Sequence, residues 1–168
     1  MNIFGRMVML SAVMVVGAGF MVVGSFADQV DHRLDGTWVG DIGGGVMEGR
    51  FKNGTYETFF DGGALDKGTY ATDNGTITMV ITQLFGSTVN DFFAKSGLRG
   101  VALESKWYSV AEFVAKLKPM LLKSGIIEKK VDELISIFVK TSTDTYTVDD
   151  KNLVIVSEKG SVSMYTRK

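Results

Sequence analysis

The chain contains no cysteine and a single histidine, His32. Without cysteine there is no disulfide framework, no thiolate zinc site and no lipid-modified cysteine. A lone histidine also lacks the partners that a histidine-based metal site or a Ser-His-Asp triad requires. His32 is therefore interpreted as a surface residue. We expect no catalytic residue, no metal and no cofactor, and hence a protein that is not an enzyme.

An excess of positive charge is absent as well. Lysine and arginine together number 18, aspartate and glutamate 19, and the formal net charge is −1. Proteins that bind nucleic acid normally carry a basic face. We therefore expect no nucleic-acid partner. The 168 residues are enough for one domain with a single core.

Long apolar runs are rare, and the one that occurs lies at the start, in "MNIFGRMVMLSAVMVVGAGFMVVGSFADQ". Arg6 precedes the uncharged run 7–23, and Ser25 and Ala27 place small residues at the −3 and −1 positions of a cleavage site. This pattern predicts a signal peptide over 1–27, cleaved near Ala27, and a periplasmic or secreted domain over 28–168. The alternative is an uncleaved anchor, because the run approaches the lower length limit of a membrane span.

Short runs of strand-forming residues follow, separated by turns. The five runs are 37–41, 46–51, 55–60, 68–72 and 76–82. Between them lie Asn53-Gly54, Asp61-Gly62-Gly63 and Asp73-Asn74-Gly75. Such turns tolerate the positive φ angles of tight hairpins. In the fifth run Ile77, Met79 and Ile81 alternate with other residues, as in a strand with one buried face. The pattern predicts an antiparallel meander.

Helical spacing replaces this alternation in an insertion at about 87–140. Thr88 is a candidate cap for a short helix that ends at Lys95. Ser109-Val110-Ala111-Glu112 has the form of a capping box, and apolar residues follow it at helical spacing. Pro119 is expected to bend or divide this second helix. A further amphipathic pattern predicts another helix before the insertion ends.

Three more strands are expected at 143–148, 152–157 and 161–167, which brings the total to eight. Eight antiparallel strands can close into a barrel, which removes exposed edges and leaves room for side chains or one small ligand. The predicted fold is mainly β. It is an eight-stranded antiparallel up-and-down β-barrel with a helical insertion between strands five and six.

Gly36-Thr37-Trp38, at the start of the first strand, resembles the Gly-x-Trp signature of the lipocalins. The phrases "GTYATDNGTITMVIT" and "DTYTVDDKNLVIVSEKGSVSMYTRK" are similar to the tyrosine, turn and aliphatic-strand cadence of lipocalin-like (calycin) domains in small exported bacterial proteins. The resemblance implies that Trp38 closes one end of the barrel and that a late arginine, here Arg167, packs across it. It also implies transport of hydrophobic molecules.

Glycines at 40–45 suggest a phosphate loop as an alternative. They lead into another strand rather than a helix and lack the Gly-Lys-Ser/Thr ending, so a flexible hairpin loop is the better interpretation.

Strand parity predicts an apolar interior with phenolic hydroxyls that can orient a ligand. The candidate ligand-binding residues are Phe51, Tyr56, Tyr70, Met79 and Tyr146. The expected function is non-covalent binding or carriage of a small hydrophobic or amphipathic molecule, such as a lipid, in the cell envelope. A fully packed barrel without a cavity is the alternative, because eight-stranded barrels occur in both forms.

Four acidic residues lie close together in the sequence: Glu48, Glu57, Asp61 and Asp66. A carboxylate pair can perform general acid–base chemistry. However, Asp61 belongs to a turn, Asp66 lies at a strand start, and strand alternation puts Glu57 on the face opposite to Tyr56 and Thr58. We therefore expect all four to be solvated charges on the outer face.

The helical insertion has two interpretations. In the first, its apolar stripes bury against the barrel rim and form a lid. In the second, the lysines around the stripes place it on a membrane interface or a protein partner, which would make the chain a peripheral envelope protein. Trp107 and Tyr108 fit either a hinge packed on the barrel or a membrane anchor. The sequence indicates neither the ligand nor the oligomeric state.

Overall fold

The computed structural model describes residues 30–42 and 44–168, and the predicted signal peptide at 1–27 lies outside them. Within these residues the strands are β1 (Gly36–Asp41), β2 (Val46–Lys52), β3 (Thr55–Phe60), β4 (Gly63–Asp73), β5 (Thr76–Phe85), β6 (Trp107–Ser109), β7 (Ser142–Val148), β8 (Asn152–Val156) and β9 (Val162–Arg167). The helices are the short 3-10 helix η3 (His32–Leu34), then α2 (Gly86–Lys95), α3 (Val110–Lys123) and α4 (Glu128–Val139).

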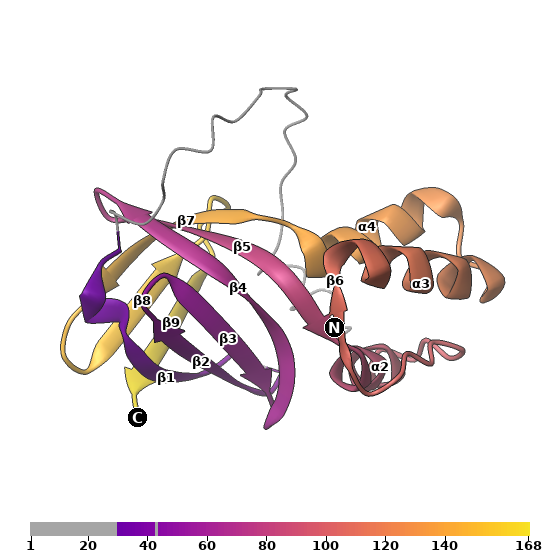
Figure 1. The fold of residues 1–168 in the computed structure, drawn as a ribbon, viewed down its shortest axis with the longest axis horizontal. Helices are drawn as coiled ribbons and strands as arrows, with labels where there is room; N and C mark the ends of the chain where they lie inside the picture. Colours follow the sequence, from indigo (N-terminus) through magenta and orange to yellow (C-terminus); the bar gives the residue numbers. More distant parts are fainter. Residues whose placement is uncertain (1–29, 43) are drawn as a thin grey trace.

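Eight of these strands close into an antiparallel barrel (Figure 1). Each barrel strand pairs with its neighbours along the chain, β5 pairs with β7 across the insertion, and β1 pairs with β9 to complete the ring. The predicted up-and-down barrel with its insertion after strand five is thus confirmed. Strand β6 was not expected: it is a three-residue strand that extends the sheet beside the end of β5.

The hairpin turns form where the sequence predicted them. Asn53, Asp61 and Asn74 have φ angles of 49°, 48° and 45°, and each is followed by a glycine that also has a positive φ. Asparagine, aspartate and glycine adopt this left-handed conformation at lower cost than other residues. These turns set the register of the hairpins over β2–β3, β3–β4 and β4–β5.

Strand β4 begins at Gly63 rather than at residue 68, which corrects the sequence prediction. Thr58 pairs with Asp66, and the next residue of β3, Phe59, pairs with Ala64, so Leu65 is the extra residue of a β-bulge. A bulge interrupts the alternation of faces along a strand. The first half of β4 therefore lacks the period of two that identifies strands in a sequence.

The helix starts were predicted with mixed success. Ser109 caps α3 as expected: its Oγ accepts from the Glu112 amide at 3.3 Å, and its own amide donates to Glu112 Oε2 at 3.0 Å. Pro119 lies inside α3 and does not divide it. Thr88 is not a cap, because β5 runs directly into α2 at Gly86 and Thr88 is buried in the first helical turn.

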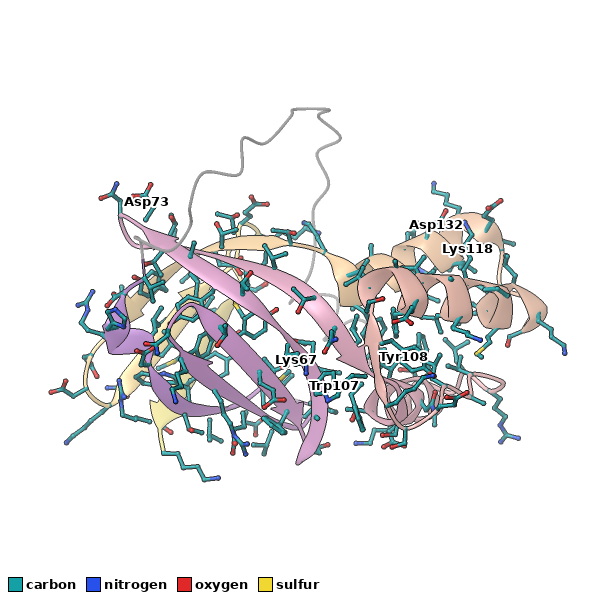
Figure 2. All side chains as sticks on the ribbon, in the orientation of Figure 1. Lys67, Asp73, Trp107, Tyr108, Lys118 and Asp132 are labelled. Atoms are coloured by element: carbon teal, nitrogen blue, oxygen red, sulfur yellow. The ribbon has the colours of Figure 1, made fainter. Side chains whose placement is uncertain are left out.

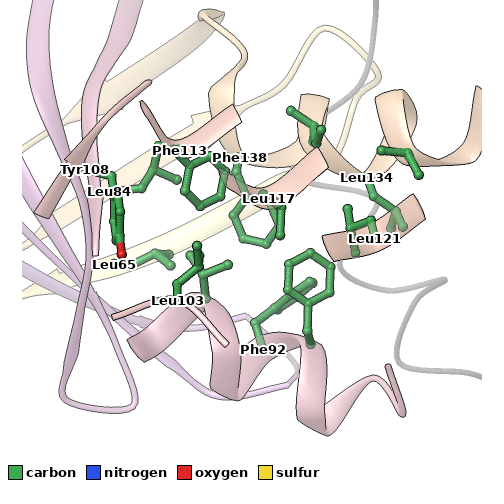
Figure 3. Packing of buried hydrophobic residues seen from close by; sticks show 14 of the residues in the cluster. Leu65, Leu84, Phe92, Leu103, Tyr108, Phe113, Leu117, Leu121, Leu134 and Phe138 are labelled. Carbon is green, nitrogen blue, oxygen red and sulfur yellow. The ribbon is translucent and has the colours of Figure 1, made fainter. Parts of the chain in front are cut away.

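Two hydrophobic clusters form the core of the described residues. One occupies the barrel around Trp38. The other joins the three α-helices to the end of the barrel, where Phe138 lies 5.1 Å from Phe92 and 5.9 Å from Phe113 between ring centroids (Figure 3). Leu84 of β5 belongs to the same cluster. The apolar stripes of the insertion therefore pack on one another and on the barrel end.

Polar contacts complete the packing of the insertion. Lys118 of α3 lies 3.0 Å from Asp132 of α4 on the outer side of the helix pair (Figure 2). Trp107 packs beside the barrel, with Lys67 Nζ 4.4 Å from its ring centroid and the Phe85 ring at 5.2 Å. Tyr108 is buried, and its hydroxyl accepts from the Glu104 amide at 3.0 Å. These contacts agree with the hinge interpretation of Trp107 and Tyr108.

Candidate functional site

The barrel contains a partly open cavity of about 420 Å³. All eight barrel strands contribute to its wall, and α2 and α4 add Phe92, Ile137 and Phe138. The volume falls within the range of small-molecule sites in proteins, which are concave, mostly apolar and carry a few polar groups. The cavity therefore decides against the interpretation of a fully packed barrel.

Three of the five predicted ligand-binding residues lie on this wall: Phe51, Tyr56 and Met79. The rings of Phe51 and Tyr56 stack with centroids 6.0 Å apart, and Trp38 lies on the same wall. Gly49 also contributes, and its lack of a side chain leaves more space on this face of β2. Aromatic and aliphatic surface of this kind suits an apolar ligand.

Tyr70 and Tyr146 lie elsewhere, outside the lining of the cavity. Their hydroxyls donate to carboxylates of the segment before β1: Tyr70 to Asp35 Oδ1 at 3.1 Å, and Tyr146 to Asp31 Oδ2 at 2.8 Å. Burial raises the pKa of both phenols, and the adjacent carboxylates add to this effect. The two tyrosines thus hold the segment before β1 against one end of the barrel.

Trp38 and Arg167, which the lipocalin resemblance pairs at the end of the barrel, are in contact here. Trp38 is fully buried, and its Nε1 donates to the Leu34 carbonyl at 2.7 Å. The Arg167 guanidinium lies 4.3 Å from the indole centroid and donates to the carbonyls of Asp35 at 2.8 Å and Arg33 at 2.7 Å. A guanidinium over an indole face is a favourable contact. Buried and hydrogen-bonded side chains therefore occupy this end of the barrel.

Asp31 connects several parts of this closed end. Its Oδ1 accepts from the Arg33 amide at 3.0 Å, and its Oδ2 lies 2.7 Å from Arg33 Nη2. The Arg33 side chain, followed by the Tyr146 hydroxyl, lowers the pKa of Asp31 to about 2, although burial acts in the opposite direction. The amide of Asp31 also donates to Thr72 Oγ1 at 2.9 Å. The ionised form is thus the one that this end of the barrel stabilises.

Three of the four clustered acids lie where the sequence placed them. Glu48 forms ion pairs with Arg50 at 2.7 Å and Lys168 at 3.0 Å. Asp61 occupies the β3–β4 turn and accepts from the Val46 amide at 2.9 Å. Glu57 alternates with the inward-facing Tyr56 and Thr58 along β3. None of these three lines the cavity.

Asp66 is the exception, and the prediction of an outer-face charge was wrong for it. Asp66 lines the cavity directly across from Thr58, its partner in the β3–β4 register. Burial raises the pKa of its carboxyl to about 6. The sequence held a signal for this position. Counting back by twos from the buried Tyr70 passes through Gly68 to Asp66, so an earlier start of β4 would have revealed it.

The Thr58 hydroxyl is close enough to lower the pKa of Asp66, but the two groups lack the geometry of a full hydrogen bond. Its Oγ1 is buried and has no hydrogen-bond partner in the described part of the chain. Within the same residues, Asp66 is absent from every ion pair. Thr58 and Asp66 thus form one polar region of the lining, and no cation of the described residues pairs with it.

A second polar region of the lining lies around the start of β7 and just after the end of β8. It contains Lys140, Ser142, Asp144 and Glu158. Burial raises the pKa of Asp144, whereas the Ser142 hydroxyl and the Lys140 charge act in the other direction. Asp144 therefore has a cation among its neighbours, in contrast to Asp66.

Comparison of the chain with protein-family models, with curated proteins and with solved structures gives no match. Over residues 30–42 and 44–168, no three His, Cys, Asp or Glu side chains are grouped so as to hold a metal ion. The helices of that part of the chain are too short or too polar to cross a membrane.

Proposed function

We propose that this protein binds, and carries without chemical change, a small hydrophobic or amphipathic molecule inside its barrel. The observation that carries the proposal is the cavity of about 420 Å³, walled by side chains from all eight strands. Phe51, Tyr56 and Met79 offer the ligand apolar surface, and the few polar groups orient it. Trp38 and Arg167 seal the far end, and this seal supports a place among the lipocalin-like (calycin) barrels.

The cell envelope is the proposed location. The charge, apolar run and small residues within 1–27 support export with cleavage near Ala27, into the periplasm or the medium. A carrier in such a compartment meets lipids and other amphipathic molecules that are poorly soluble in water. The absence of cysteine means that the barrel depends on its core and its hydrogen bonds rather than on disulfides.

Native mass spectrometry tests this function. The chain is produced in a bacterium with its own N-terminal segment, purified under mild conditions, and measured intact before and after denaturing extraction. The expected result is a small-molecule adduct that is lost on denaturation, on a chain that begins after Ala27. A chain that stays free of adduct, also after incubation with fatty acids and phospholipids, would count against the carrier function.

A pair of variants on one strand shows whether an adduct occupies the cavity. Ile155 lines the cavity, whereas its neighbour Val154 does not. Ile155→Trp is expected to fill the cavity and remove the adduct, and Val154→Trp is expected to retain it. Equal adduct on both variants would place the ligand outside the barrel.

The turn between α3 and α4 supports a second candidate function, binding to a membrane surface. Ile127 in this turn and Leu122 at the end of α3 keep 72% and 41% of their area exposed. Exposed lysines flank them in the sequence at 123, 129 and 130. Apolar side chains bordered by lysines favour contact with anionic lipid. Flotation with phosphatidylglycerol vesicles tests this. Ile127→Ser should reduce flotation. Val162→Ser also replaces an exposed apolar side chain by a polar one, but on β9, and should not reduce it.

A further inference from the structure

We propose that the cavity selects an amphipathic ligand with a protonated amine, and that the Asp66 carboxylate is the counter-ion of that amine. The inference rests on the proposed carrier function, because it names the ligand class of the same cavity. It is carried by the position of Asp66, by the missing cation, by the unsatisfied Thr58 hydroxyl and by the aliphatic and aromatic surface elsewhere in the lining.

The position of Asp66 follows from the register of three strand pairs. Trp38 lies across from Gly49, Gly49 across from Thr58, and Thr58 across from Asp66. These four residues form one layer of the interior, and all of them line the cavity. The β3–β4 register is regular from Thr55 and Thr69 to Thr58 and Asp66, and the β-bulge at Leu65 lies just beyond this layer. A charged group is thus held by the backbone at a defined depth in the barrel rather than at its rim.

Among the described residues, the cation that a buried carboxylate normally requires is missing around Asp66. The next residue, Lys67, lies over the Trp107 ring at 4.4 Å on the outer side of the sheet. Lys140 acts on Asp144, and no cation contributes to the electrostatics of Asp66. An ionised carboxylate is costly to bury unless it is paired. A cationic ligand would supply the partner.

The Thr58 hydroxyl indicates the same ligand group. It is buried without a full hydrogen bond, and such an atom costs free energy until a partner arrives. An alkylammonium group has three N–H donors and no acceptor. It can therefore donate to the Asp66 carboxylate and to Thr58 Oγ1 at once, because the two residues face each other across β3 and β4. A carboxylate ligand would instead place two like charges together.

The remaining wall suits the apolar part of such a ligand. Met79 and Ile81 of β5 and Ile155 of β8 present aliphatic surface to the cavity. Tyr56 stands beside the proposed ammonium site: burial raises the pKa of its phenol, and the Asp66 charge adds to the effect. An aromatic ring near the carboxylate is also a favourable neighbour for a ligand cation.

Three ligands that differ only in the head group test the inference: octylamine, octanol and octanoate. Their binding to the full chain is measured by calorimetry near pH 8, where Asp66 is ionised and the amine is protonated. Octylamine is expected to bind about tenfold or more tighter than octanol, because a hydrogen-bonded charge pair exceeds a neutral contact by that factor. Octanoate is expected to bind most weakly.

Variants assign the preference to one carboxylate. Asp66→Asn should reduce octylamine binding to the level of octanol, and Asp66→Glu, which keeps the charge, should retain a preference for the amine. Glu57→Gln makes the same charge change on the outer face of β3 and should leave the preference intact. Asp144→Asn should do so too, because Asp144 already has Lys140 as a neighbour.

The outcomes separate this inference from the carrier function. Equal binding of octylamine and octanol to the unmodified chain overturns the amine preference and leaves the carrier function standing; this comparison needs no variant. Loss of the preference in Asp144→Asn but not in Asp66→Asn overturns the role of Asp66. Failure of all three ligands to bind, together with a chain free of adduct, overturns the carrier function itself.

Discussion

Replacing Asp66 by asparagine is expected to stabilise the empty protein at neutral pH. Burial raises the pKa of this carboxyl from its ordinary value of 3.8 to about 6. The folded state therefore favours the protonated form. The resulting contribution to stability is fully present below the unfolded pKa and is lost as the pH rises through the folded pKa.

The magnitude follows from the size of this shift. Each pKa unit corresponds to about 1.4 kcal/mol, so the unmodified protein should lose on the order of 3 kcal/mol between about pH 4 and pH 7. An asparagine side chain does not ionise, so the variant escapes this loss. The difference in unfolding free energy between Asp66→Asn and the unmodified chain should thus grow across this pH window and level off above it.

Urea unfolding followed by tryptophan fluorescence measures this difference at a series of pH values. Glu57→Gln is the matched control, because it removes one carboxylate from the outer face of the neighbouring strand; its difference from the unmodified chain should stay nearly constant. A difference for Asp66→Asn that does not change between about pH 4 and pH 7 would show that the carboxyl is hydrated. That result would refute the argument from burial.

Three further positions at the closed end and one in the cavity are probed by substitution. Thr58→Val removes a buried hydroxyl without a full hydrogen bond, so we expect it to raise the unfolding free energy of the empty protein by about 1 kcal/mol while weakening octylamine binding. Tyr146→Phe removes the 2.8 Å hydrogen bond to Asp31 and should cost about 2 kcal/mol in urea unfolding; a cost near zero would mean that water replaces the hydroxyl. Because the pKa of Asp31 is lowered to about 2, its contribution is present above 3.8 and lost as the pH falls towards 2, so Asp31→Asn should flatten the acid side of the stability profile. Arg167→Lys keeps the charge but not the planar fork that reaches two carbonyls, so thermal unfolding should occur at a lower temperature; an unchanged midpoint would show that the stacking on Trp38 contributes little.

Local chemistry explains the part of the fold that the sequence predicts. Asn53, Asp61 and Asn74 identify the hairpins because the required φ angles suit few residues, and Ser109 identifies a helix start because its hydroxyl caps a free amide. Ile77 belongs to an apolar alternation that predicts a strand with one buried face, and in the structure Ile77 is fully buried while the adjacent residues of β5 are not. Each of these signals lies within a few consecutive residues.

The candidate site was harder to predict because its determinants are not local. The β-bulge at Leu65 interrupts the alternation at the start of β4, so the sequence pattern places the strand start too late and misses the inward-facing Asp66. Tyr146 finds its partner Asp31 across a separation of 115 residues, which no periodic pattern records. The cavity volume depends on how side chains from eight strands fill a shared space, and parity alone does not determine that filling.

Closure of the barrel by β1 and β9 has a consequence for the order of folding. The Arg167 guanidinium reaches the Asp35 carbonyl across 132 residues, so the seal at this end cannot form until nearly the whole described chain is present. The α3 and α4 hairpin, by contrast, is built from neighbouring residues and can form early. A chain that leaves the ribosome, or crosses a membrane, from its N-terminal end would expose an unclosed sheet until β9 arrives. Deleting β9 should therefore leave a helical unit attached to strands that aggregate through their open edges.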